Sequence, residues 1–208
     1  AKKNGVPVRI IHSHNTKMTG NIMHNILHKL HSFDIDKVAT HYLACGELAG
    51  QWMYGKSKVK DKFCIIYNGI RLKDYEYNNE IRKNMRVAFG IKNEIVVGHA
   101  GRFMEVKNHK FLLDIFKEFH GNYGDSLLIL AGDGDLYDDI QKYAKDIGIS
   151  DYVKFLGMRN DIEKVIQAMD VMVIPSLYEG FPVIAIEAQA NGLPVYLSDT
   201  ITKEAVIK

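Results

Sequence analysis

The chain has 208 residues, which is more than one small domain needs and less than two full domains usually take. Its 47% hydrophobic and 25% charged residues are ordinary for a soluble globular protein and allow a core without disulfide or metal staples. The net charge of +2, with scattered basic residues, gives no stripe for nucleic acid, and no apolar run approaches the roughly 20 residues of a membrane span.

Apolar runs of strand length alternate along the chain with segments of helical periodicity, which predicts an α/β fold with a parallel sheet. The predicted strands cover residues 8–11, 38–45, 63–67, 95–100, 127–131, 153–156, 171–175 and 195–198. The predicted helices cover residues 22–30, 46–54, 111–119, 136–147, 162–169 and 182–191. The polar segment 75–86 is assigned to neither class.

The pair Asn68-Gly69 is a turn signal and marks a predicted domain boundary. Residues 1–68 are expected to be a partial α/β segment, and residues 69–208 a Rossmann-like domain of common size. Because the chain starts at Ala1, directly before a strand pattern, and stops at Lys208 without a terminal helix, we expect a fragment of a longer enzyme.

Cysteine usage and the N-terminus bear on the compartment. Cys45 and Cys64 have neither metal-type nor redox-type spacing, and we expect both to be reduced, buried thiols of a cytoplasmic protein. The first five residues lack the apolar segment of a signal peptide.

Ligands of open parallel sheets bind at the carboxyl ends of the strands. After the strand at 95–100, Gly101 leaves room for a close approach of the backbone, and Arg102 offers a planar fork for phosphate oxygens. Lys107 directly precedes a helix that Asn108 could cap. Two cations and a helix N-terminus at one point suit a diphosphate, although an exposed Arg and Lys on a loop remain the alternative.

The strand at 171–175 ends in a second unusual segment. Pro182 fits a first helical turn, so Glu179 lies in the loop before the helix and Glu187 more than a turn inside it. Both carboxylates are predicted to face one cleft, where they can accept sugar hydroxyls. The amides open to an anion there are those of Gly180, Phe181 and Val183.

Glu187 is either a solvated helix residue or a buried carboxylate with a partner. The apolar neighbours on almost all sides of its helix favour the second interpretation.

Two further strand ends carry weaker signals. Turn and helix-cap chemistry explains the residues Gly132-Asp133-Gly134-Asp135 better than a ligand does. Met158 and Arg159 end another strand and are candidates for contact with a nucleotide base.

The histidines divide into two groups. His24, His28 and His31 share one helical face, but no carboxylate or cysteine nearby completes a zinc site, so a polar interdomain face is favoured and no metal site is assigned. His14 follows a strand in a turn and is expected to point into a cleft between domains.

At these residues the sequence resembles the family-4 retaining glycosyltransferases of the GT-B fold, in particular bacterial capsule and exopolysaccharide enzymes. EGFPVIAIE, residues 179–187, matches the family's E-x7-E signature, and GHAGRFMEVKNHKFLLDIF, residues 98–116, matches its Gly-Arg…Lys diphosphate loop. The further matches, in the family's order and spacing, are RIIHSHNT, NGIRLKDY, LAGDGDL, VKFLGMRNDI and EAQANGLPVYLSD.

The resemblance implies transfer of a hexosyl group from a nucleotide diphosphate sugar, with UDP-hexose as the expected donor and with retention at the anomeric carbon. Arg102 and Lys107 would neutralise the leaving diphosphate in place of a divalent metal, so no metal cofactor is expected. The charge that grows on that diphosphate in the transition state makes two fixed cations useful.

The same resemblance implies roles for the remaining candidates. Glu179 and the backbone of Gly180-Phe181 would hold the donor sugar, Glu187 would hold the ribose hydroxyls, and His14 would help to position the sugar or the acceptor. The implied acceptor is a glycan or a lipid-linked saccharide, used in the bacterial cytoplasm with peripheral association at the inner face of the membrane.

Parts of the family pattern are missing, and other functions stay open. The glycine-rich loop and several strands of the N-terminal domain are absent, so we expect this polypeptide to bind donor but to transfer sugar poorly. A non-catalytic nucleotide-binding module or a sugar-nucleotide epimerase would use the same architecture. A phosphorylase would also need a lysine site for pyridoxal, which the sequence does not display.

Overall fold

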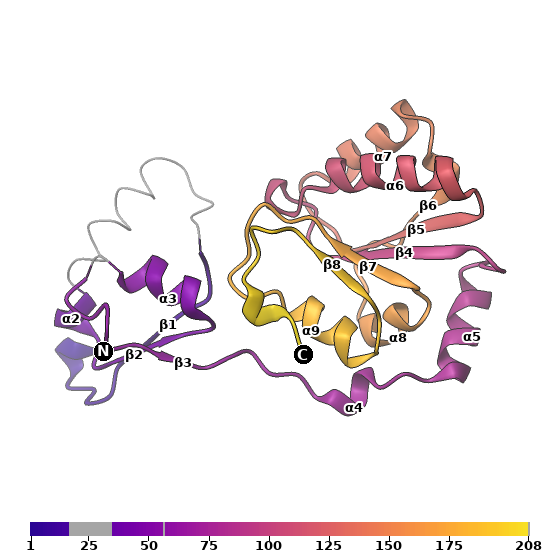
Figure 1. Cartoon of the computed structure of the whole chain (residues 1–208). Helices are drawn as coiled ribbons and strands as arrows, with labels where there is room; N and C mark the ends of the chain where they lie inside the picture. Colours follow the sequence, from indigo (N-terminus) through magenta and orange to yellow (C-terminus); the bar gives the residue numbers. More distant parts are fainter. Residues whose placement is uncertain (17–34, 56, 208) are drawn as a thin grey trace. The chain divides into compact units, whose positions relative to one another are not determined.

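The computed structural model describes residues 1–16, 35–55 and 57–207. The chain forms two compact units (Figure 1). The first unit takes in residues 1–69 together with 178–182 and 200–205, and the second comprises residues 70–177, 183–199 and 206–208. The predicted helix at 22–30, with His24 and His28, and also His31 lie outside the described residues.

The first unit is built on a three-stranded parallel sheet with the order β1-β2-β3. Its strands are β1 (Ile10–Ser13), β2 (His41–Ala44) and β3 (Cys64–Ile65). Its helices are η1 (Lys2–Asn4), α2 (Ile35–Val38), α3 (Glu47–Tyr54) and η4 (Lys203–Ala205).

Tyr54 is the centre of this unit's core. Its side chain is fully buried, and its hydroxyl donates to the carbonyl oxygens of Ile11, at 3.0 Å, and Leu43, at 2.9 Å. Burial raises the pKa of Tyr54 to about 12, so the hydroxyl remains a donor. One side chain thereby links β1 to β2 and gives a small unit a fixed centre.

The second unit contains a five-stranded parallel sheet with the order β6-β5-β4-β7-β8. Its strands are β4 (Ile95–Ala100), β5 (Ser126–Ala131), β6 (Val153–Phe155), β7 (Val171–Ile174) and β8 (Val195–Leu197). The central strands β4 and β5 pair in register from Ile95↔Ser126 to Ala100↔Ala131. Helices cover both faces of the sheet, which is why these two strands are apolar along almost their whole length.

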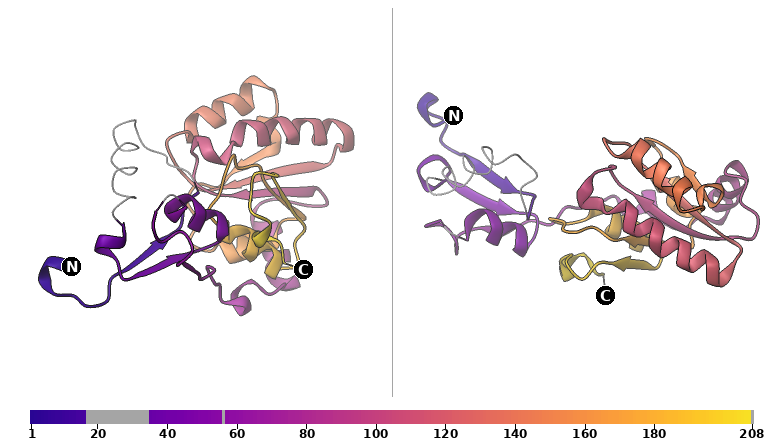
Figure 2. Two further views of the ribbon diagram at one scale, coloured as in Figure 1. Left: turned by 60° about the vertical axis from the view of Figure 1, so that its left-hand side comes forward. Right: turned by 90° about the horizontal axis from the view of Figure 1, so that it is seen from above.

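The helices of the second unit lie in two layers (Figures 1 and 2). One face of the sheet is covered by α6 (His109–Tyr123) and α7 (Tyr137–Asp146). The other face carries α4 (Leu72–Tyr75), α5 (Asn79–Ala88), α8 (Ile162–Gln167) and α9 (Val183–Ala190). The 3-10 turns of this unit are η2 (Glu105–Lys107) and η3 (Ser150–Tyr152).

The α/β fold with parallel sheets is confirmed, but helix α5 falls in the segment that the sequence left unassigned. Asn78 begins this helix by accepting hydrogen bonds from the amides of Glu80 and Ile81 at 3.0 and 3.1 Å. Its partly buried side carries Arg82 and Arg86 beside Ile81 and Met85, and both arginines reach Asp170, directly before β7. Ion pairs therefore supply part of the attachment of this helix, and a search for apolar periodicity cannot detect them.

Two local expectations were wrong. Residues 66–71 are extended, and the backbone of Gly69 does not adopt the positive φ that a turn of this type uses. Cys45 is buried as expected, but Cys64 is exposed because it lies on the short edge strand β3. Both thiols are free.

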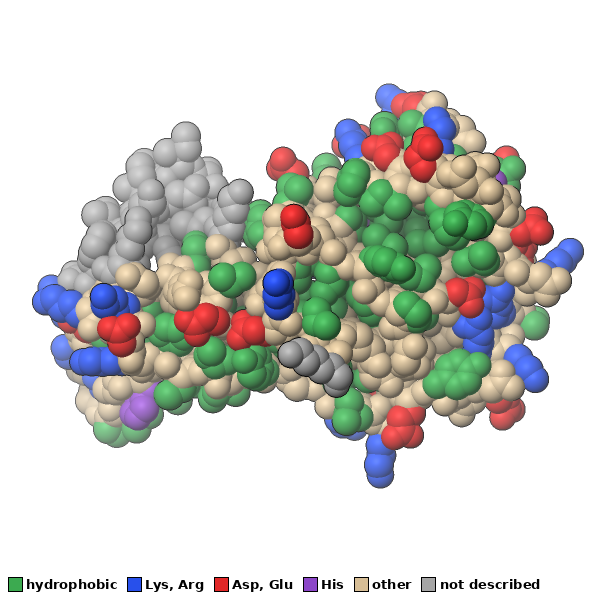
Figure 3. Space-filling view, in the orientation of Figure 1, with side chains coloured by type: hydrophobic (Ala, Val, Ile, Leu, Met, Phe, Trp, Pro, Cys, Tyr) green, Lys and Arg blue, Asp and Glu red, His purple; other side chains and the backbone are tan. Residues whose placement is uncertain are grey.

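Charged side chains form no large patch of a single sign on the face seen in Figure 3. Lys and Arg side chains are interspersed there with Asp and Glu.

Within the described part of the chain, no helix has the length and apolar character to cross a membrane.

Candidate functional site

The loops that follow β4 to β7 lie side by side at the carboxyl edge of the second unit's sheet. Main-chain hydrogen bonds join each loop to a neighbour, so the edge is held by backbone atoms. The bonds are Gly101 N–H to Ala131 O at 2.9 Å, Gly132 N–H to Gly157 O at 2.8 Å and Leu177 N–H to Val106 O at 2.8 Å.

The segment Gly132-Asp133-Gly134 shapes this edge. Gly132 has a φ of 139°, and a Cβ on it would lie 2.0 Å from the carbonyl oxygen of Gly101. Gly134 has a φ of 153°, and its Cβ would lie 2.6 Å from the carbonyl oxygen of Phe103. Asp133 accepts a hydrogen bond from the amide of Gly134 at 2.8 Å, but no side chain of this segment caps α7, so the helix-cap part of the prediction is wrong. The glycines instead permit a close approach of two backbone segments.

Arg102 and Lys107 both lie at the end of β4. Arg102 is exposed, and its guanidinium has no hydrogen bond or ion pair within the described residues. The Cε atom of Lys107 lies 3.5 Å from the place where a Cβ of Gly101 would sit, so the lysine side chain runs over this glycine. The structure thus brings both predicted cations to the segment that follows β4, and a common anion for them stays a prediction.

A cavity of about 300 Å³ opens beside Arg102. Gly101 and Arg102 line one side of it, and Met158 and Arg159 line another. Arg159 is bound to Asp161 through two hydrogen bonds of 2.8 and 2.7 Å, so its guanidinium is already partly engaged. Asp133 and Ile162 also line this cavity, and the sequence pattern did not single them out as ligand contacts.

Asn108 does not cap helix α6 through its side chain, contrary to the prediction. Its backbone has a φ of 54°, and its Nδ2 donates to the carbonyl oxygen of Pro175 at 3.4 Å. This bond turns the amide away from the helix N–H groups and ties the start of α6 to the end of β7.

Glu187 is held by a partner, as the apolar surroundings required. It is the fifth residue of α9, and its Oε1 accepts a hydrogen bond of 2.6 Å from the hydroxyl of Tyr75, the last residue of α4. The sequence pattern did not identify Tyr75. The only signal was a polar aromatic residue at the end of NGIRLKDY, and its contact lies 112 positions away in the chain.

Glu179, Gly180 and Phe181 belong to the first unit. The hydroxyl of Thr16 donates to the carbonyl oxygen of Glu179 at 3.0 Å, and a Cβ on Gly180 would lie 2.0 Å from the carbonyl oxygen of His14. The backbone approach that Gly180 allows therefore brings this loop against the end of β1.

The remaining candidates of this region are split between the units. Pro182 is buried in the first unit, and Val183 starts α9 in the second, so the helix begins one residue later than predicted. Glu179 and Glu187 also lie in different units, and a shared cleft for them stays a prediction. Partial desolvation, followed by the charge of the neighbouring His12, lowers the pKa of His14.

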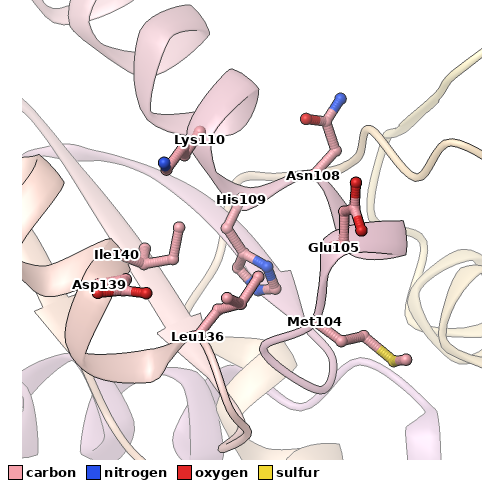
Figure 4. Close-up of a pocket in the computed structure, with 8 residues that line it drawn as sticks. All are labelled: Met104, Glu105, Asn108, His109, Lys110, Leu136, Asp139 and Ile140. Carbon is pink, nitrogen blue, oxygen red and sulfur yellow. The ribbon is translucent and has the colours of Figure 1, made fainter.

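A separate cavity of about 360 Å³ lies between the start of α6, η2 and the start of α7 (Figure 4). The side chains of His109 and Leu136 point toward one another in it, while that of Asn108 points away. His109 is 2% exposed and stacks on Phe103 with ring centroids 4.1 Å apart. Burial, and then the charges of His99 and Lys107, lower the pKa of His109 to about 3.

This histidine is expected to make the protein acid-sensitive. The unfolded chain binds its proton near pH 6.5 and the folded chain only near pH 3, so stability falls as the pH falls through that window. Between pH 7 and pH 5 the loss is about 2 kcal/mol. His109→Leu should flatten the pH dependence of urea unfolding over this range. An equal loss in the variant and the wild type would contradict the assignment.

Within the described residues, no group of three or more His, Cys, Asp and Glu side chains is arranged to hold a metal ion.

A model of the family described as glycosyl transferases group 1 matches residues 81–208. The chain belongs to the group 1 glycosyl transferases.

Two curated relatives agree with this membership. The putative glycosyltransferase EpsF of Bacillus subtilis is 38% identical over 210 residues, which cover 98% of this chain and 54% of the relative. The UDP-Gal:alpha-D-GlcNAc-diphosphoundecaprenol alpha-1,3-galactosyltransferase of Escherichia coli is 32% identical over 151 residues, covering 71% of this chain and 39% of the relative. This group 1 glycosyl transferase chain therefore spans about half the length of such relatives or less.

The fold has a counterpart among solved structures. Anabaena HepE, in a crystal structure with UDP-glucose, matches with a TM-score of 0.85 and 22% identity, covering 96% of this chain and 55% of that chain. At this identity the likeness establishes the GT-B fold of the group 1 glycosyl transferase chain.

Proposed function

We propose that this group 1 glycosyl transferase chain binds a UDP-hexose and serves the transfer of its hexosyl group, with retention of configuration, to a glycan or lipid-linked acceptor. The observation that carries the proposal is that Arg102 lines a cavity of about 300 Å³, while the side chain of Lys107 runs over Gly101, which lines the same cavity. An exposed guanidinium that has no partner among the described residues is suited to bind phosphate oxygens through two parallel hydrogen bonds.

The other parts of the donor are assigned to the neighbouring loops. Met158 and Arg159 line the same cavity and are placed at the base. Glu187 is placed at the ribose, because a carboxylate accepts hydroxyl protons and its Oε2 has no hydrogen bond within the described residues. Glu179 and the amides of Gly180, Phe181 and Val183 are placed at the hexose, with Pro182 directly before α9 and His14 near the reacting carbon.

The chemistry follows from these places. The bond from the anomeric carbon to the diphosphate oxygen breaks, and a new bond forms from that carbon to an acceptor hydroxyl, which loses its proton. The diphosphate gains negative charge as it leaves. On this proposal Arg102 and Lys107 stabilise this charge and take the place of a divalent metal ion.

The relatives support the choice of donor and acceptor. The E. coli relative is named for UDP-Gal as donor and a diphosphoundecaprenol-linked sugar as acceptor, and HepE was crystallised with UDP-glucose. The Vi polysaccharide biosynthesis protein of Salmonella typhi, 32% identical over 136 residues, supports a role in surface polysaccharide synthesis. With such an acceptor, the proposed place of the reaction is the inner face of the bacterial membrane.

The test is a calorimetric titration of UDP, UDP-glucose and UDP-galactose, with EDTA present. We expect UDP to bind, and Glu187→Ala to weaken it at least about tenfold, because hydrogen bonds to a charged group are lost. Lys117→Ala, at an exposed position of α6, is the control and should bind UDP like the wild type.

Binding that requires a divalent metal would overturn the metal-free mechanism. Binding of the donor with conversion between UDP-glucose and UDP-galactose, in the absence of any acceptor, would identify an epimerase instead. Absence of binding by every nucleotide would overturn the site assignment.

A further inference from the structure

We propose that Tyr75 is a positioning residue, which holds the Glu187 carboxylate in the orientation that receives the ribose hydroxyls of the donor. This inference rests on the proposed function, because it assumes that Glu187 binds ribose. The contact that carries it is the 2.6 Å hydrogen bond from the Tyr75 hydroxyl to Oε1 of Glu187.

The bond leaves the carboxylate half engaged. A carboxylate has two oxygen atoms, and Tyr75 occupies only Oε1. Burial, and then the hydrogen bond to Glu187, raise the pKa of Tyr75, so the phenol keeps its proton and acts as a donor. A single fixed donor on one oxygen selects one rotamer of Glu187 and presents the other oxygen to a ligand.

The backbone around Tyr75 is itself held by side chains at the ends of α8 and α9. Nδ2 of Asn191, a buried residue at the end of α9, donates to the carbonyl oxygen of Tyr75 at 3.0 Å. Gln167 of α8 is buried as well, and it bonds the carbonyl of Glu76 at 2.9 Å and the amide of Asn78 at 3.0 Å. The backbone of residues 75–78 is therefore held by hydrogen bonds from α8 and from the residue that follows α9, as a positioning residue requires.

The cavities connect this tyrosine to the proposed nucleotide site. Tyr75 lines a cavity of about 610 Å³ together with Asn160 and Ile162. Ile162 also lines the cavity of about 300 Å³ beside Arg102. Ile162 thus forms part of the wall of both cavities, so the space beside Tyr75 and the space beside Arg102 share one lining residue.

A purely structural role for Tyr75 predicts a different result from a positioning role. We therefore compare the dissociation constants of UDP and 2′,3′-dideoxy-UDP, which lacks both ribose hydroxyls. Their ratio is measured on one protein sample, so partial unfolding of a variant cancels. In the wild type we expect the dissociation constant of 2′,3′-dideoxy-UDP to be about 100 times that of UDP, since the dideoxy ligand loses two hydrogen bonds to a carboxylate.

Tyr75→Phe removes only the hydroxyl and should lower this ratio about tenfold. Tyr77→Phe is the matched control, since Tyr77 is 56% exposed and its hydroxyl reaches only Asn79, at 3.5 Å. It should leave the ratio at the wild-type value. In a Glu187→Ala background the ratio should be near one, and Tyr75→Phe should change nothing further.

The outcomes separate this inference from the proposed function. If the wild type discriminates, Glu187→Ala abolishes the discrimination and Tyr75→Phe leaves it intact, then Glu187 binds ribose but Tyr75 does not position it. If Tyr75→Phe lowers the ratio equally with and without Glu187, the tyrosine acts by another route and the inference is wrong. If the wild type binds both ligands equally, or binds neither, the ribose assignment fails and the inference fails with it.

Discussion

Arg102→Ala is expected to weaken UDP binding about 100-fold, because two charge-assisted hydrogen bonds to phosphate oxygens are lost. The guanidinium is exposed and has no partner among the described residues, so its removal breaks no hydrogen bond or ion pair of that part of the chain. Uridine should bind the variant as it binds the wild type, since it has no phosphate. Calorimetric titration of UDP, UMP and uridine measures the three affinities.

Lys117→Ala serves as the control for this experiment too, because it removes one positive charge from an exposed position of α6. At low salt it should lower the UDP affinity only slightly, through the general field of the protein. An equal loss of affinity for uridine and UDP in the Arg102 variant would place the arginine at the nucleoside and refute the diphosphate assignment.

Gly132→Ala is expected to destabilise the second unit by about 3 kcal/mol or more, since a side chain there meets backbone that cannot move aside. The new Cβ would lie 2.0 Å from the carbonyl oxygen of Gly101, at a φ of 139° that side chains rarely adopt. Any folded fraction should bind UDP weakly, because relief of the clash moves the Gly101 loop. Urea unfolding followed by circular dichroism measures the first effect, and calorimetry the second.

The same substitution at Gly121 provides the comparison. Gly121 lies within α6, and a Cβ built there has no neighbour within 4 Å. Gly121→Ala should be neutral or stabilise the protein by about 0.5–1 kcal/mol, since alanine favours the helix more than glycine does. Equal stabilities for the two variants would mean that the approach of the Gly101 and Gly132 loops is not tight.

Sequence patterns predicted most of the second unit because its elements follow the rules of burial. Strands β4 and β5 are buried on both faces, so their apolar runs mark them within about one residue. Helix α5 was missed for the opposite reason. Its attachment includes the ion pairs of Arg82 and Arg86 with Asp170, and charged residues in a sequence are normally taken as solvated.

The candidate site likewise contains features that the sequence predicted and features that it did not. Burial around Glu187 correctly indicated that the carboxylate needs a partner, but not that the partner is Tyr75 from a distant helix. Asn108 carries the right side chain at the right place for a helix cap, yet Pro175 competes for its amide. Local chemistry predicts which groups need partners, whereas the tertiary fold decides between the partners available.

The main-chain hydrogen bonds that join the strand-end loops have an evolutionary consequence. Because the bonds of Gly101, Gly132 and Leu177 use amides and carbonyls, the loop shape does not depend on the side chains that face the cavity. Substitutions at Met158 or Arg159, which line the cavity, can therefore change its surface while the scaffold stays as it is, and under the proposed function they would change which base is preferred. Such a separation lets descendants of one ancestral protein diverge in donor choice by a few exchanges, without first having to regain stability.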